Sequence, residues 1–239
     1  MTSASSARTF DVRHVQLARA AFAALAAIMI TFSPDHSAVV GMAVFSGFAI
    51  ATGLVLLLAV WIVYPAGRRW PSAALGGVTI VAGMVSGLNP VRTVSGFFAV
   101  VIAWAVVSGL IELLAGVRGL RGIRARREIA PGIVDARPVV DPGPRSDSRD
   151  AVVVGAVGLL LGVGLALVPA GYSLQYTIEE AHQTLTLTGI TIGVGLFGAY
   201  AAIVAVYLGI AGFSPRKDAP VTATAEAPAS VPAEPKDPA

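Results

Sequence analysis

The chain has 239 residues, of which 55% are hydrophobic and 13% are charged. Soluble globular domains carry about 25% charged residues, so this composition, with a mean hydropathy of +0.76, excludes a water-soluble protein and predicts an integral membrane protein. The net charge of +3 comes from arginines that we expect to fix membrane orientation and not to bind nucleic acid. No cysteine is present, which excludes disulfides and thiol chemistry.

Six apolar runs are long enough to cross a bilayer, which takes roughly 20 residues. The first run also resembles a signal peptide, because Arg8, Arg13 and Arg19 are followed by apolar residues. It exceeds a typical signal core, however, and a second span follows after a very short turn, so we predict that it is retained. The sequence therefore predicts an all-α membrane protein whose six transmembrane helices cover residues 16–32, 37–64, 72–88, 94–117, 151–168 and 185–213.

These spans divide the chain into five parts. A cytoplasmic N-terminus at 1–15 precedes a four-helix membrane region at 16–117. An Arg- and Pro-rich cytoplasmic linker at 118–150 leads to a third transmembrane hairpin at 151–213. The linker begins with "RGLRGIRARR", from Arg118 to Arg127, which is either a plain topology signal or a surface for anionic headgroups. The tail at 214–239 is rich in proline and alanine and is predicted to be disordered.

The cations lie almost entirely on one side of the predicted membrane. Sixteen of the 17 lysines and arginines fall before or at the start of the first span, in the second and fourth connections, or in the tail. The three alternate connections hold only Arg92. Because cytoplasmic connections carry the excess of Lys and Arg, we expect both termini to be cytoplasmic.

Two stretches of the chain repeat at a spacing of 56 residues. The shift superposes Pro34 on Pro90, and "TGLVLLLA" from Thr52 on "SGLIELLA" from Ser108. Proline suits a turn between helices because it cannot continue the preceding helix. A looser third unit turns at Pro169 and carries an insertion after it. We therefore predict three helical hairpin repeats.

Three predicted helices carry two glycines four residues apart, which gives a helix a small-residue face for close approach. Such a face serves either packing inside one molecule or an interface between copies in a homo-oligomer. The pairs are Gly83 and Gly87, Gly158 and Gly162, and Gly189 and Gly193.

No familiar catalytic motif is present: the sequence lacks a phosphate-binding P-loop, an HExxH motif and a GxSxG motif. We therefore expect a non-enzymatic protein with no catalytic residues, cofactor or metal. The predicted outer connections do collect titratable side chains, which are candidates for a pH-sensing cluster because imidazoles gain charge in an acidified exterior. A divalent metal site and ordinary solvated loops are the alternatives. The residues are Asp35, His36, Glu179, Glu180 and His182.

Glu112 is a carboxylate inside an otherwise apolar run. It lies six residues before Arg118, which is about 9 Å at 1.5 Å per residue, so we place it near the cytoplasmic boundary and not at the bilayer centre. Counted from the turn at Pro90, Arg68 and Arg69 lie at a similar depth on the neighbouring helix. We therefore predict that Glu112 forms an ion pair with Arg68 or Arg69 at this boundary.

The stretch "GRRWPSAALGGVTIVAGMVSGLNP" and the later "FFAVVIAWAVVSGLIELLAGVRGLR" resemble the HdeD-like acid-resistance membrane proteins. That family repeats a helical hairpin with Arg-Arg-Trp at its start, Pro at its turn and a Gly-Ile/Leu-x-Glu pattern before a terminal Arg. The matching positions are Arg68, Arg69, Trp70, Pro90, Gly109, Glu112 and Arg118. The resemblance implies a six-span protein of the bacterial plasma (inner) membrane linked to acid or envelope stress.

The leading hypothesis is thus a non-enzymatic multi-pass membrane protein of HdeD-like type that serves in acid or envelope stress tolerance. A small transporter or channel subunit is the first alternative. It predicts polar side chains that converge near mid-bilayer, where the sequence offers little beyond Ser, Thr and Gly. A scaffold that binds a larger membrane complex is the second. The expected partners are the lipid bilayer and either further copies of the chain or a larger membrane complex.

Overall fold

The computed structural model describes residues 10–128, 145–178 and 183–214. Six α-helices in these residues are long and apolar enough to cross a membrane, which indicates a multi-pass membrane protein. The helices are α1 (Val12–Phe32), α2 (Ala38–Ile62), α3 (Trp70–Gly87), α4 (Val94–Glu128), α5 (Arg145–Leu167) and α6 (Gly189–Phe213). The shorter elements are the 3-10 helices η1 (Ala66–Arg68) and η2 (Asn89–Val91) and the strands β1 (Ser173–Ile178) and β2 (Gln183–Thr188).

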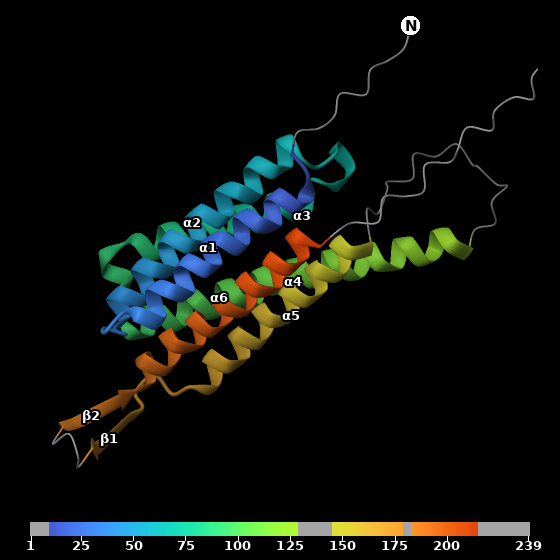
Figure 1. The fold of residues 1–239 in the computed structure, drawn as a ribbon. Coiled ribbons are helices and arrows are strands. Elements are labelled where there is room, and N and C mark those ends of the chain that lie inside the picture. Colours follow the sequence, from blue (N-terminus) through green and yellow to red (C-terminus); the bar gives the residue numbers. More distant parts are fainter. Residues whose placement is uncertain (1–9, 129–144, 179–182, 215–239) are drawn as a thin grey trace, which may run out of the picture.

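The six helices run alongside one another in an elongated bundle (Figure 1). The β1–β2 hairpin projects from one end, which we call the hairpin end. At the other end α1 begins and α6 ends, and α4 extends past its neighbours. Arg13, Arg68 and Arg118 belong to this second end, which we call the arginine-rich end.

Side chains and prolines at the ends of the helices account for several of the boundaries. Asp11 forms a capping box with His14 at the start of α1, and the Ser37 and Thr188 hydroxyls accept backbone hydrogen bonds at the starts of α2 and α6. The three prolines expected at turns all lie in connections. Pro34 lies between α1 and α2, Pro90 in η2, and Pro169 between α5 and β1.

Each helix packs most extensively against one neighbour: α2 against α3, α4 against α5, and α1 against α6. Glycines bring the backbones of two of these pairs together. A Cβ atom added at Gly53 would lie 2.9 Å from the carbonyl oxygen of Gly76, and one added at Gly109 would lie 2.9 Å from that of Gly155. Gly53 and Gly109, which the 56-residue shift superposes, thus make the same kind of contact in α2–α3 and in α4–α5.

The paired glycines predicted from the sequence also pack inside the molecule. A Cβ atom at Gly83 would lie 2.8 Å from Ile50 Cγ1, and one at Gly162 would lie 3.0 Å from Val106 Cγ2. One at Gly193 would lie 3.0 Å from the ring of Phe98. Intramolecular packing, the first of the two interpretations of these glycines, is therefore confirmed.

Aromatic side chains from α2, α4 and α6 fill the centre of the bundle. Neighbouring rings meet edge to face, with centroids 5.0 Å apart for Phe45 and Trp104, 5.4 Å for Phe45 and Phe197, and 5.7 Å for Trp104 and Tyr200. Edge-to-face pairs of this kind contribute about 0.5–1.5 kcal/mol beyond the burial of their area. We call Phe45, Phe48, Trp104, Phe197 and Tyr200 the aromatic cluster.

The sixth helix begins at Gly189 and not at residue 185, because the residues before it form an antiparallel hairpin. Its register pairs Ser173 with Thr188 and Leu174 with Leu187. Apolar and polar residues alternate along both strands, so Leu174, Tyr176 and Leu187 belong to one face of the hairpin. The insertion expected after Pro169 therefore has regular structure, apart from residues 179–182, which lie outside the described residues.

The predicted linker at 118–150 is helical at both of its ends. α4 continues to Glu128, ten residues past Arg118, and α5 begins at Arg145. Arginine, leucine and alanine are good helix formers, and no proline occurs between Pro90 and Pro131 to end the helix. The predicted span ended before Arg118 because it counted only apolar residues that can cross a bilayer. The helix itself is not limited to apolar residues, and it continues through the arginines.

Candidate functional site

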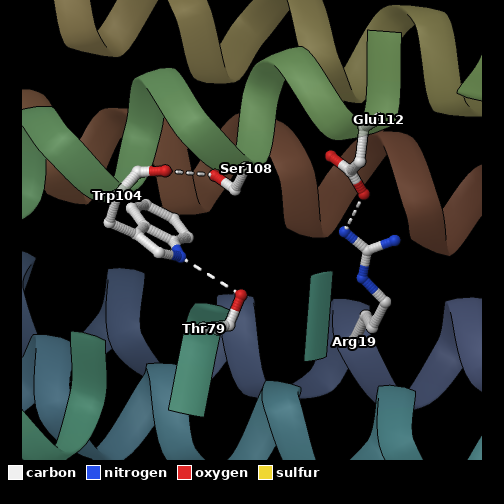
Figure 2. A network of polar contacts seen from close by, with 5 residues as sticks. All are labelled: Arg19, Thr79, Trp104, Ser108 and Glu112. Atoms are coloured by element: carbon white, nitrogen blue, oxygen red, sulfur yellow. Dashed lines mark hydrogen bonds and ion pairs between the residues drawn. The ribbon is translucent and has the colours of Figure 1, made fainter. Parts of the chain in front are cut away.

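A buried ion pair joins α1 to α4. The Arg19 guanidinium donates from Nη2 to the Glu112 carboxylate, with 2.6 Å between Nη2 and Oε1 (Figure 2). The side chains of Arg19 and Glu112 are only 16% and 9% exposed. Arg19 lies seven residues inside α1, so the pair lies within the bundle and not at its surface.

The predicted partner of Glu112 was wrong. Among the residues that the structure describes, Arg19 is the only one within ion-pair distance of Glu112. Arg69 instead donates from Nε to the backbone oxygen of Tyr64, 3.0 Å away, and its guanidinium lies 5.9 Å from the ring centre of Trp61. Counting residues from a turn gives the depth of a side chain along the bundle, but it does not give the face on which that side chain lies.

Further polar side chains lie beside the pair. Trp104 Nε1 donates to Thr79 Oγ1 at 3.2 Å, and the Ser108 hydroxyl donates to the Trp104 backbone oxygen at 2.6 Å (Figure 2). With the ion pair they border an inner cavity of about 10 Å³, roughly the space of one water molecule. The polar lining comes from five of the six helices: Arg19, Thr52, Thr79, Trp104, Ser108, Glu112 and Tyr200.

Two of these polar atoms are buried without a hydrogen-bond partner in the described part of the chain. They are Arg19 Nε and Thr52 Oγ1, and both residues line the inner cavity. Buried polar groups in proteins are nearly always hydrogen-bonded, to protein or to water. The inner cavity therefore offers one donor and one hydroxyl to a small polar guest beside the ion pair.

A larger, open cavity of about 370 Å³ lies at the arginine-rich end. It is lined by the starts of α3 and α5 and by α4 from Ile111 to Gly122. Arg19 and Glu112 line both cavities, so the ion pair forms the boundary between them. Arg68, one of the residues proposed from the sequence, lies on the wall of this open cavity.

Toward the hairpin end, the aromatic cluster closes the interior. Phe45 precedes Thr52 on α2, and Phe97 precedes Ser108 on α4, so both rings lie on the hairpin side of the ion pair. Phe45, Phe97 and Phe197 are completely buried. The polar site is thus reached from the arginine-rich end and closed at the other.

A second polar cluster joins three helices without lining either cavity. Asp150 of α5 accepts from Gln16 Nε2 of α1 at 2.7 Å and from the Tyr207 hydroxyl of α6 at 3.0 Å. These contacts hold α1, α5 and α6 together near the arginine-rich end. The cluster has no access to the inner site, which makes it a suitable control for experiments on the ion pair.

The predicted pH-sensing cluster is only partly within the described residues. The Asp35 carboxylate accepts from the backbone N and the hydroxyl of Ser37, at 2.8 and 2.9 Å, and so serves the turn before α2. His36 is half-buried. Glu179, Glu180 and His182 lie outside the described residues. Within the described ranges, no group of three or more His, Cys, Asp or Glu side chains is arranged to hold a metal ion.

Most of the residues around the ion pair were not predicted from the sequence. Arg19 was counted only among the cations that indicate orientation, although a cation seven residues inside the first helix and a carboxylate inside the fourth were both visible in the sequence. Hydroxyl side chains are common in membrane helices. Nothing in the sequence therefore marked four further residues as part of a site: Thr52, Thr79, Ser108 and Tyr200.

The chain matches no protein-family model, no curated protein and no solved structure.

Proposed function

We propose that the protein is a small, non-enzymatic transporter or channel subunit whose working site is the Arg19–Glu112 ion pair. One observation carries the proposal: five helices direct polar side chains at a buried ion pair that is open to one end of the bundle and closed by aromatic rings at the other. Polar groups that converge inside the helix bundle support the transporter hypothesis, which predicts such a convergence near mid-bilayer. Ionisable residues inside membrane bundles typically mark the paths of ions, protons or substrates.

A purely structural role accounts less well for the pair. Burying two charges costs several kcal/mol per ion, and well-packed apolar side chains of similar volume often stabilise a core as much. In the predicted repeat Leu56 is the counterpart of Glu112, and it too is buried and lines the inner cavity. An apolar residue thus fits the equivalent place, which supports a role for Glu112 that depends on its charge.

The species that fits the site is small and charged. The Glu112 carboxylate offers a partner to a small cation, and the Arg19 guanidinium offers a partner to an anion that enters through the open cavity. Movement toward the hairpin end then requires the aromatic cluster to shift, as the rings of Phe45 and Trp104 lie in the way. Both termini at the cytoplasmic side would place the open cavity on the cytoplasmic side in this state.

Reconstitution of the full chain into liposomes tests the proposal. Proton flux is followed with an enclosed pH-sensitive dye after an acid pulse, and anion flux with a chloride electrode. We expect wild-type liposomes to exceed empty ones in at least one assay, and Glu112→Gln to abolish the excess. Asp150→Asn is the matched control and should keep it. Flux that is no faster than in empty liposomes, or that is unchanged by Glu112→Gln, would contradict the proposal.

The resemblance to HdeD-like proteins adds a cellular role, tolerance of acid or envelope stress at the bacterial inner membrane. A buried ion pair on the wall of the open cavity supports this role, because its carboxylate is a charged group that a proton entering through that cavity would meet. The test is survival of a deletion strain after acid shock, complemented with the wild-type gene, Glu112→Gln or Asp150→Asn. We expect Glu112→Gln to fail and Asp150→Asn to restore survival. A deletion strain as resistant as its parent would overturn the stress role.

A further inference from the structure

We propose that the open cavity at the arginine-rich end binds one phosphate-bearing anion, held by Arg68 and Arg118. This inference is independent of the transport proposal, since it concerns a different part of the wall from the Arg19–Glu112 pair. It rests on the space, the charge and the rim of the cavity.

The cavity is large enough for a phosphate group with a substituent. Its volume is about 370 Å³, within the range of about 300–1,000 Å³ typical of small-molecule sites. Small residues make this space on the α4 side, where Ala115, Gly116, Gly119 and Gly122 line the wall. These four small residues leave space between α3 and the start of α5, and Ile111, Glu112 and Arg118 line the same cavity from α4.

The charge of the wall favours an anion. Three arginines, Arg19, Arg68 and Arg118, and two carboxylates, Glu112 and Asp147, line the cavity, which leaves one net positive charge. Arg19 is engaged by Glu112, so Arg68 and Arg118 are the cations that a ligand meets. Arginine is suited to phosphate because its planar guanidinium donates two parallel hydrogen bonds to it.

The start of α3 adds to this field. α3 begins at Trp70 without a side-chain cap, and its first residues Trp70, Pro71 and Ser72 lie on the cavity wall. The N-terminus of a helix carries a partial positive charge of roughly half a unit and favours anions. The cavity thus combines two arginines with an uncapped helix start.

We expect the rim of the cavity to lie at the level of the membrane headgroups. Trp70 lines the cavity and is 56% exposed, and tryptophan is enriched at the headgroup level of bilayers. A phosphate at this depth has two sources, the headgroup of an anionic lipid and a free phosphate from the aqueous side. The shared chemistry is the phosphate group, and the experiment separates the two sources.

Arg121 allows binding inside the cavity to be distinguished from a general attraction of anionic lipids to the basic segment of α4. It lies on α4 three residues after Arg118 and is exposed, but it does not line the cavity. Attraction of anionic lipids by the whole basic segment depends on Arg121 as much as on Arg118. A cavity site depends on Arg118 and Arg68 only.

The test uses the full chain in nanodiscs of phosphatidylcholine, with or without one quarter phosphatidylglycerol. Native mass spectrometry counts the phosphatidylglycerol retained, and calorimetry follows inorganic phosphate added to the phosphatidylcholine discs. We expect the Arg68→Gln/Arg118→Gln double variant to lose about tenfold in retention or affinity, and Arg121→Gln to stay within about twofold of wild type. Thermal unfolding of each variant verifies that it is folded.

Each outcome decides the proposal. Selective retention of phosphatidylglycerol assigns the site to a lipid headgroup, and phosphate binding without such retention assigns it to a free phosphate. The proposal is overturned if neither ligand binds to the folded wild-type chain. It is also overturned if Arg121→Gln loses as much binding as the double variant. Because flux is not measured here, failure of this test leaves the role of Glu112 in transport untouched.

Discussion

Removing either side chain of the Arg19–Glu112 pair leaves the other charge inside the bundle without its counterion. The remaining charge has lost its solvation by water and gained nothing in return. Removing both charges together avoids this penalty, because the inner cavity already accepts apolar neighbours such as Leu56 and Leu75. Removal of one charge is therefore expected to lower both stability and function, whereas removal of both charges is expected to lower function alone.

Arg19→Met is expected to lower the free energy of unfolding by about 3–5 kcal/mol, the usual cost of stranding one member of a buried pair. Arg19→Met/Glu112→Leu should recover most of that loss while remaining inactive in the flux assays. Unfolding of the purified protein in detergent, followed by circular dichroism, measures both. A single variant as stable as wild type would mean that the pair is solvated and not buried.

Two buried threonines differ only in whether their hydroxyls have a partner. Thr79 Oγ1 accepts from Trp104 Nε1, whereas Thr52 Oγ1 has no hydrogen-bond partner within the described residues. Thr79→Val should cost about 1–3 kcal/mol, because it strands the indole N–H, and Thr52→Val should be neutral or slightly stabilising. The same unfolding measurement compares them. Equal effects would show that the Trp104–Thr79 hydrogen bond contributes nothing.

At this scale, the sequence predicted that Glu112 would be paired, but not with which residue. Its distance from Arg118 correctly placed it toward the arginine-rich end of the bundle. Its partner was missed because α1, where Arg19 lies, is 93 residues away in the chain, and only the arrangement of the helices brings it opposite α4. Contacts between distant helices depend on which faces meet, and single-helix patterns do not contain that information.

The helices differ in how much of their structure could be inferred from composition. All six apolar runs form helices, because roughly 20 apolar residues have few alternatives in a membrane. The β hairpin was missed because Leu185 and Leu187 were counted as part of an apolar run. In "QTLTLT" the leucines alternate with threonines, and a period of two is typical of a strand.

Close packing of α4 on α5 depends on glycines that leave no room for a side chain. A Cβ atom at Gly155 would lie 2.6 Å from the backbone nitrogen of Leu113 and 2.7 Å from the carbonyl oxygen of Gly109, so the helices would have to separate. At Gly195 of α6, by contrast, a Cβ atom meets nothing within 4 Å. The two positions are both helical and differ only in their surroundings.

Gly155→Ala should therefore destabilise the protein by about 1–3 kcal/mol, as overpacking of a core does. Gly195→Ala should be neutral or stabilising by up to about 1 kcal/mol, because alanine is the better helix former. Thermal unfolding in detergent measures both substitutions. If Gly155→Ala unfolds at the wild-type temperature, α4 and α5 are not in backbone contact.

For the whole molecule, the two ends of the bundle differ in chemistry. One end carries the arginines and the open cavity, and the other carries a hairpin whose residues 173–178 are uncharged. Within the described residues the number of candidate spans is even, so the start of α1 and the end of α6 lie on one side if all six helices cross. The distribution of cations predicts that this side is the cytoplasmic one, and the open cavity then faces the cytoplasm.

Orientation can be measured directly, because the chain contains no cysteine. Single cysteines are placed at Leu174 on the hairpin and at Arg124 on α4, both exposed. We expect Leu174→Cys to react with a membrane-impermeant maleimide in intact cells, and Arg124→Cys to react only after permeabilisation, because cytoplasmic segments carry the excess of arginine. The reverse pattern would turn the open cavity outward, and an acidified exterior would then reach Glu112 through the cavity without crossing the aromatic cluster.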